Sequence, residues 1–180
     1  MQLKGSMVMV RSMTQSDLPK LVQWKNDPEI ADLVRGAPIY TNLTMETKRF
    51  EKSLENGEAL RLMLCTGEGE SIGFMVITDL DKPNKKANLG MLIGEKQYWN
   101  RGLGSEAMEV ILKHFFDNLG FNRIGLEVFE YNLRARHMYR KVGFVEEGIQ
   151  RQGLVKGDKY YDVILMGITK ADYNKKQSGD

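Results

Sequence analysis

A glycine-containing turn is the first feature of this chain that suits chemistry. Gly102 and Gly104 stand in the segment YWNRGLGSEA and open a long stretch with the apolar period of a helix. The first backbone N–H groups of a helix have no partner within it, and the helix dipole adds positive charge there. Glycines let an anion approach those groups without meeting a Cβ atom, so the turn predicts an anion site. Its candidate residues are Asn100, Arg101, Gly102, Leu103, Gly104 and Ser105. A loop that only reverses the chain has the same composition, so the turn alone leaves both interpretations open.

A second segment, EVFEYNLRARHMYRKVGF, follows about one helix and one strand later. Asn132, Ala135 and Tyr139 stand three and four residues apart, which places them on one helix face with Arg136 beside them. A helix that only filled a core would carry Leu, Ile or Val there, because buried polar groups are costly. We therefore expect this face to bind a ligand. For Tyr139 taken alone, an amphipathic tyrosine at a sheet edge is the alternative.

The elements that position these segments alternate between helix and strand. The order is β-α-α-α-β-β-β-α-β-α-β-β, which predicts an α/β fold with a mixed, mostly antiparallel sheet of about seven strands and helices on both faces. Readable strands cover 7–13, 59–66, 70–80, 86–95, 123–129 and 159–168. The helix at 102–119 has a predicted buried stripe that ends at Leu119, with Gly120 as its C-terminal cap. No motif is readable in the loops expected around residues 24–45 and 147–160.

The composition fits one domain of 1–180, with a core of about 7–172 and a polar tail at 173–180, whose last residues, KKQSGD, we expect to be frayed. Lys and Arg total 26 against 24 Asp and Glu, and no basic stripe suggests nucleic acid. No apolar run has the length of a membrane span and no signal-peptide core is present, so we expect a cytoplasmic protein that binds neither nucleic acid nor membrane. The two histidines, His114 and His137, have no partners at ligand spacing, and Cys65 is the sole cysteine, so no metal site is expected.

The two segments resemble the acetyl-CoA site of the GNAT superfamily of N-acetyltransferases. The pattern N-x-x-A-x-x-x-Y-x-x-x-G-F is matched at every specified position, ending in Gly143 and Phe144. The pattern Q/R-x-x-G-x-G/A is matched at both glycines, with Trp99 where many members have Gln or Arg. The resemblance runs from the MVRSM opening to Met166 and is nearest to the branch of ribosomal-protein N-terminal and spermidine acetyltransferases. It implies the GNAT fold, in which two central strands splay apart at the cofactor.

The resemblance also implies roles for the two segments. The turn would hold the pyrophosphate of acetyl-CoA, with Arg101 adding charge. Asn132 would hydrogen-bond the pantetheine arm, Arg136 would lie near the phosphates, and Tyr139 would direct its hydroxyl at the sulfur. Tyr139 is therefore the predicted catalytic acid, which protonates the departing CoA thiolate.

The strand KANLGMLIGE supplies a third part of the implied site. Backbone groups of Met91, Leu92 and Ile93 would pair with pantetheine, and one donor would polarise the thioester carbonyl. Asn88 stands where many relatives carry the Glu that is a frequent candidate for the base. An amide cannot deprotonate an amine, so the sequence leaves the base unidentified.

The predicted reaction is direct attack of a primary amine on the thioester in a ternary complex, without an enzyme nucleophile. The acceptor is a polyamine such as spermidine, a protein N-terminus, an amino sugar or an amino-acid derivative. Acidic residues of the N-terminal helices, Glu29 and Asp32 among them, favour a cationic acceptor, although exposed helices are often charged in any case. A non-catalytic acyl-CoA-binding sensor is the alternative from another class. The resemblance also makes a homodimer plausible.

Overall fold

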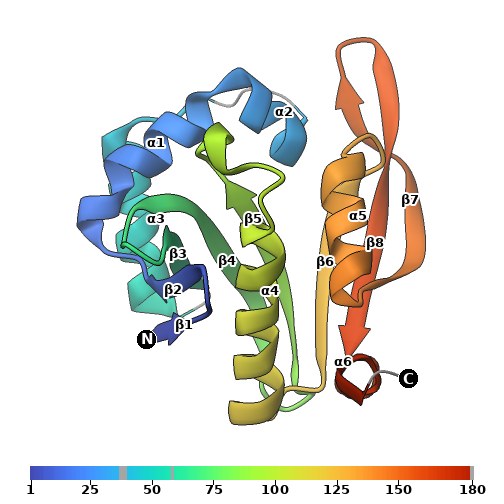
Figure 1. The fold of residues 1–180 in the computed structure, drawn as a ribbon. Coiled ribbons are helices and arrows are strands. Elements are labelled where there is room, and N and C mark those ends of the chain that lie inside the picture. The colour runs from blue at the N-terminus through green and yellow to red at the C-terminus, as the bar shows by residue number, and fades with distance from the viewer. Residues whose placement is uncertain (37–39, 58, 179–180) are drawn as a thin grey trace.

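The computed structural model describes residues 1–36, 40–57 and 59–178. Its centre is one eight-stranded sheet in the order β1-β2-β3-β4-β5-β6-β8-β7, one strand more than predicted (Figure 1). The strands are β1 (Gln2–Lys4), β2 (Val8–Ser12), β3 (Leu60–Thr66), β4 (Ser71–Asp81), β5 (Lys86–Ile93), β6 (Arg123–Phe129), β7 (Val145–Lys156) and β8 (Lys159–Thr169). The longer helices are α1 (Leu18–Asn26), α2 (Pro28–Arg35), α3 (Leu43–Asn56), α4 (Leu103–Lys113), α5 (Leu133–Val142) and α6 (Lys170–Ser178). The mixed, mostly antiparallel α/β architecture is confirmed.

The sheet opens between its two central strands. β5 and β6 are parallel and pair only from Lys86↔Arg123 to Asn88↔Gly125. Beyond that point β5 stays paired with β4 as far as Ile93, and β6 stays paired with β8 as far as Phe129. The predicted splay is therefore present, and it leaves backbone groups on the facing edges of β5 and β6 without strand partners.

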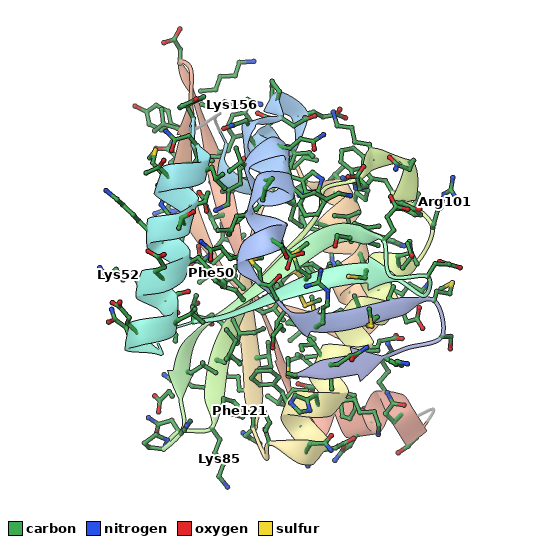
Figure 2. All side chains as sticks on the ribbon, turned by 90° about the vertical axis from the view of Figure 1, so that its left-hand side faces the viewer. Phe50, Lys52, Lys85, Arg101, Phe121 and Lys156 are labelled. Carbon is green, nitrogen blue, oxygen red and sulfur yellow. The ribbon has the colours of Figure 1, made fainter. Side chains whose placement is uncertain are left out.

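Helices cover both faces of the sheet. α1, α2 and α3 lie on one face over a cluster that contains Trp24, Phe50 and Leu92. On α3, Phe50 points into this cluster while Lys52 points outward to solvent (Figure 2). α4 and α5 cover the other face, over the larger core cluster that contains Leu89 and Tyr139. Because side chains alternate along β5, this one strand contributes to both layers.

A π-helical segment, His114–Asn118, continues α4 and changes which residues face the core. Phe115 and Phe116 are both buried there, at 1% and 0% exposure. A π turn takes up about one extra residue and rotates the following positions around the axis. Leu119, predicted in the buried stripe, is therefore 49% exposed.

Three elements at the ends of the chain differ from the sequence-based expectation. β1 was not predicted. The predicted order ends in two strands, but the first of them had no readable range, and β7 occupies most of the segment expected to be a loop at 147–160. The register of β7 against β8 shifts twice, which interrupts the alternation that marks a strand. The fraying predicted for KKQSGD is wrong as far as residue 178, because α6 extends to Ser178. Tyr173 anchors this helix: it is 7% exposed and its ring lies 5.2 Å from that of Phe116.

Candidate active site

A cavity of about 310 Å³ lies where β5 and β6 separate. Its walls come from β5, the turn before α4, α5, and the apolar side of α2, which lies near the open end of the gap (Figure 1). Ten residues singled out in the sequence analysis line this cavity: Met91, Leu92, Ile93, Asn100, Gly102, Gly104, Ser105, Asn132, Ala135 and Tyr139. The structure thus brings together two segments that are separated in the chain by α4 and β6.

The turn before α4 adopts a backbone that few residues other than glycine favour. Gly102, the N-terminal capping residue, has φ 81°, and Asn100 has φ 61°. No described residue accepts a hydrogen bond from the amides of Leu103, Gly104 or Ser105. The start of α4 therefore presents free N–H groups and positive dipole charge to the cavity.

Trp99 is fixed at the edge of this turn. Its indole Nε1 donates to the backbone oxygen of Ile93 at 2.8 Å. The guanidinium of Arg134, from α5, lies 3.7 Å from the centre of the indole ring. This stack joins the turn to α5 beside the cavity, and Arg134 is a lining residue that the sequence analysis missed.

The backbone N–H groups of the three predicted pantetheine contacts, Met91, Leu92 and Ile93, do not all point to the same side of β5. The amide of Gly94 donates toward β4, to the oxygen of Ile72 at 2.8 Å, whereas the oxygen of Ile93 accepts from Trp99 on the other side. Because these directions alternate along a strand, the amides of Met91 and Ile93 face the gap. The amide of Leu92 points toward β4, so only the amides of Met91 and Ile93 can pair with a ligand in the gap.

Tyr139 lies deep in the cavity wall. Its side chain is 5% exposed, and its ring packs 5.7 Å from that of Phe144. Its hydroxyl makes no hydrogen bond to a described residue. Every fully buried side-chain oxygen or nitrogen in the described part of the chain does have a partner, so this hydroxyl is not fully buried and must be open to the cavity. Burial raises the pKa of Tyr139 to about 12, so the phenol carries its proton at neutral pH.

Asn132 has a structural role at the same wall. Its Oδ1 accepts from the amide of Ala135 at 3.2 Å, which caps α5. Its Nδ2 donates to the backbone oxygen of Leu33 in α2 at 3.1 Å. Asn132 therefore holds α2 and α5 together at the cavity while it also lines it.

The geometry and the pattern of residues agree with one protein family. The model of the acetyltransferase (GNAT) domain matches residues 8–145. The chain belongs to the GNAT family of acetyltransferases. It is accordingly an acetyl-CoA-dependent N-acetyltransferase with acetyl-CoA as its co-substrate, as predicted.

Several GNAT proteins are similar to this chain over most of its length. An uncharacterized N-acetyltransferase p20 of Bacillus licheniformis is 27% identical over 91% of this chain and 93% of its own. A spermidine N(1)-acetyltransferase of Escherichia coli is 23% identical over 92% of this chain and 88% of its own. The crystal structure of a spermidine N-acetyltransferase from Vibrio cholerae, in complex with CoA and spermine, has a TM-score of 0.87 and 22% identity, covering 94% of this chain and 99% of that one.

Not all residues that the GNAT resemblance assigned to the cofactor lie at the cavity. Arg136 instead pairs with Glu146 at 2.9 Å and donates to the oxygen of Glu130 at 3.0 Å. The side chain of Arg101 projects to solvent, with its guanidinium 5.8 Å from the Tyr98 ring (Figure 2). The side chain of Leu103 is buried in the core, so only its amide remains available. Spacing alone could not reveal Glu146, which draws Arg136 away.

The three residues suggested for the acceptor are also engaged elsewhere. Glu29 pairs with Lys96 at 2.7 Å, and Asp32 pairs with Lys156. Asn88 donates to Asp79 at 2.9 Å. None of the three lines the described cavity.

Two kinds of feature are absent from the described residues. They contain no group of three His, Cys, Asp or Glu side chains arranged to hold a metal ion. Nor do they contain a helix with the length and apolar character needed to cross a membrane.

Proposed function

We propose that this enzyme transfers the acetyl group of acetyl-CoA to a primary amine, with both substrates bound at once. The observation that carries the proposal is the pairing of the uncapped start of α4 with the unpartnered hydroxyl of Tyr139 in one cavity. The first suits the cofactor pyrophosphate, and the second suits the sulfur. Met91 and Ile93 line the same cavity, and their amides suit pairing with the pantetheine arm.

The chain's own groups support a direct transfer. The acceptor nitrogen attacks the thioester carbon, a C–N bond forms, and the negative charge on oxygen is stabilised by a β5 amide. The C–S bond then breaks, and its electron pair leaves with sulfur. Tyr139 donates its proton to that sulfur, the acceptor nitrogen releases one proton to solvent, and Tyr139 regains a proton from solvent, so one proton moves from nitrogen to sulfur overall. Cys65 is buried in β3 among the residues on the α1–α3 side and does not line the cavity, so the proposed reaction does not pass through a covalent cysteine intermediate.

For the acceptor we propose a polyamine or a peptide N-terminus. Support for a polyamine comes from the similar spermidine acetyltransferases of Escherichia coli and Vibrio cholerae. A similar putative ribosomal N-acetyltransferase of Bacillus subtilis, 26% identical over 59% of this chain and 57% of its own, supports a protein N-terminus. Glu29 and Asp32 remain the proposed attractants for a cationic acceptor, although each is paired with a lysine. A cytoplasmic location and a homodimer remain predictions.

The test is a thiol-release assay with saturating acetyl-CoA and a panel of spermidine, spermine, basic peptides with free N-termini and an amino sugar. We expect amine-dependent release of CoA thiol, with the acetylated amine identified by mass spectrometry. Tight CoA binding without turnover on any amine would instead support a non-catalytic acyl-CoA sensor.

A further inference from the structure

The cations of α5 are sorted into two groups by their neighbours. On the side away from the cavity, Arg136 and Arg140 both pair with Glu146, at 2.9 and 2.6 Å. On the cavity side, Arg134 and Lys141 make no ion pair or hydrogen bond with a described residue. A helix that needed these charges only for solubility would have no reason to line one cavity with unpaired cations, so this side of α5 is suited to an anion.

Arg134 is the best organised of the cavity-side cations. Its guanidinium stacks on Trp99, whose own orientation is set by the hydrogen bond to Ile93 on β5. Such a stack leaves the edge of the guanidinium, with its N–H donors, directed away from the ring. Burial lowers the pKa of Arg134 and Glu29 opposes the change, but an arginine remains charged at any working pH. Arg134 is therefore a pre-oriented donor beside the turn that begins α4.

We infer that Arg134, held on Trp99, binds the pyrophosphate of the cofactor together with the α4 amides. The inference rests on the proposed function and assigns to Arg134 the phosphate contact that the sequence suggested for Arg136. Trp99 acts as the positioning residue: it has no charge, but it fixes the guanidinium next to Asn100 and Gly102. A Gln or Arg at this turn position could reach a phosphate itself, whereas Trp99 presents a cation from another helix.

The experiment compares Arg134→Gln with the matched control Arg140→Gln, which removes the same charge from the outer side of α5. Affinities are measured by calorimetry for CoA and dephospho-CoA, and by competition against acetyl-CoA for pantetheine. Arg134→Gln should weaken CoA and dephospho-CoA by about 10- to 100-fold, because a charged hydrogen bond to phosphate is lost. Pantetheine, which lacks phosphates, should bind as before, and Arg140→Gln should bind all three like wild type.

Three results would overturn the inference. Unchanged CoA affinity in Arg134→Gln removes the contact. If Arg134→Gln loses affinity for pantetheine as much as for CoA, the role of Arg134 is structural. If it loses affinity for CoA but not for dephospho-CoA, Arg134 contacts the 3′-phosphate and not the pyrophosphate. Trp99→Leu tests the positioning role, since it should weaken CoA in the same direction while Arg134 is still present. Failure of wild-type enzyme to bind CoA would be a different result, because it contradicts the proposed function rather than the role of Arg134.

Discussion

The starts of α3 and α4 differ in whether a side chain caps the first backbone amides of the helix. At α3, Asn42 closes the helix by accepting from the amide of Met45 at 2.9 Å. At α4, the corresponding residue is Gly102, which has no side chain to offer. Replacing a capping side chain by alanine typically costs about 1 kcal/mol, whereas replacing it by glycine costs only about a few tenths. With Gly102 as its cap, α4 therefore loses little stability, and its free amides are available to a ligand.

Charges show the same division between these two regions. Under α3, Glu46 is fully buried and accepts from Lys25, Thr41 and Arg49 at 2.6 to 2.8 Å. Around the cavity, Arg134 carries its charge without an acidic contact among the described residues. Polar groups that are satisfied internally hold the fold, and polar groups left unsatisfied in a cavity indicate where the ligand binds.

The largest effect expected at the cavity comes from Tyr139→Phe. The ring and its packing on Phe144 remain, so the fold and CoA affinity should change little. Loss of one positioned general acid should slow the chemical step by about 100- to 10,000-fold, or about 3 to 5 kcal/mol. Single-turnover acetyl transfer to a confirmed acceptor measures this step. A rate within a factor of about three of wild type would remove Tyr139 from the mechanism.

The pH dependence sharpens the assignment of Tyr139. Its pKa of about 12 keeps the phenol protonated in any ordinary assay. An alkyl amine acceptor loses its proton near pH 10, so kcat/KM should rise with pH toward about that value without a falling limb. A decline in kcat/KM that starts near neutral pH, in enzyme shown to remain folded, would contradict a tyrosine acid.

The matching prediction in the α3 region concerns stability. Burial by itself raises the pKa of Glu46, but hydrogen bonds from Lys25 and Thr41 outweigh it and leave the pKa below its ordinary value. Glu46→Gln should lower the free energy of unfolding by about 1.5 to 3 kcal/mol, because the buried carboxylate loses its charge-assisted hydrogen bonds from Lys25 and Arg49. Denaturant titration measures the loss, and Lys113→Gln, which breaks the exposed pair with Asp117, should cost at most about 0.5 kcal/mol.

The Glu46 contribution also has a defined pH window. A carboxyl whose pKa is depressed in the folded state stabilises fully above its unfolded value and loses this contribution as pH falls through the folded value. The stability gap between wild type and Glu46→Gln should therefore be widest at neutral pH and narrow in acid. A gap that widens as pH falls would contradict the ion pair.

An anionic side chain placed at the start of α4 should remove the anion site. Gly104→Asp puts a carboxylate where the pyrophosphate is proposed to lie, and the nearest atom to the new Cβ is the flexible Met91 Cε at 3.4 Å. CoA affinity should fall by more than about 100-fold through like-charge repulsion. Calorimetry on the folded variant measures it. Gly148→Asp in β7 adds the same charge at a position that does not line the cavity, where the new Cβ meets only Leu165 Cδ1 at 3.6 Å, and it should leave the affinity unchanged.

The smallest expected effect tests whether the acidic residues of α2 attract the acceptor. Lys156→Gln frees the carboxylate of Asp32 from its ion pair. If Asp32 draws a cationic acceptor, the KM for spermidine should fall about two- to five-fold, a change typical of one exposed charge pair, while the KM for acetyl-CoA stays constant. If the KM for spermidine does not change, Asp32 does not attract the acceptor and is only a surface charge.

The parts of the site that could be predicted from sequence depend on local spacing. The turn at Gly102 and Gly104 and the helix face of Asn132 and Tyr139 are set within a few residues, and both lie at the cavity. The splay between β5 and β6 followed from the family resemblance.

The parts that were missed depend on contacts between distant segments. Arg136 pairs with Glu146 of β7. The register shifts of β7 interrupt the alternation of apolar and polar residues, so this strand could not be recognised in the sequence. Burial of Phe116 beside Phe115 requires a π turn, which is a result of packing against the sheet and α6. One missed feature had a readable signal: Arg134 and Lys141 stand seven residues apart, which puts two cations on one side of α5.

Hydrogen exchange with and without CoA tests most directly whether the uncapped end of α4 and the gap edge of β5 form the cofactor site. Without ligand, the amides of Leu103, Gly104 and Ser105 have no acceptor among the described residues and should exchange quickly. CoA should slow exchange at these amides and at Met91 and Ile93, while the capped start of α3 at Met45 exchanges as before. Protection at α3 with no change at residues 91–93 and 100–105 would place the cofactor elsewhere and contradict the account.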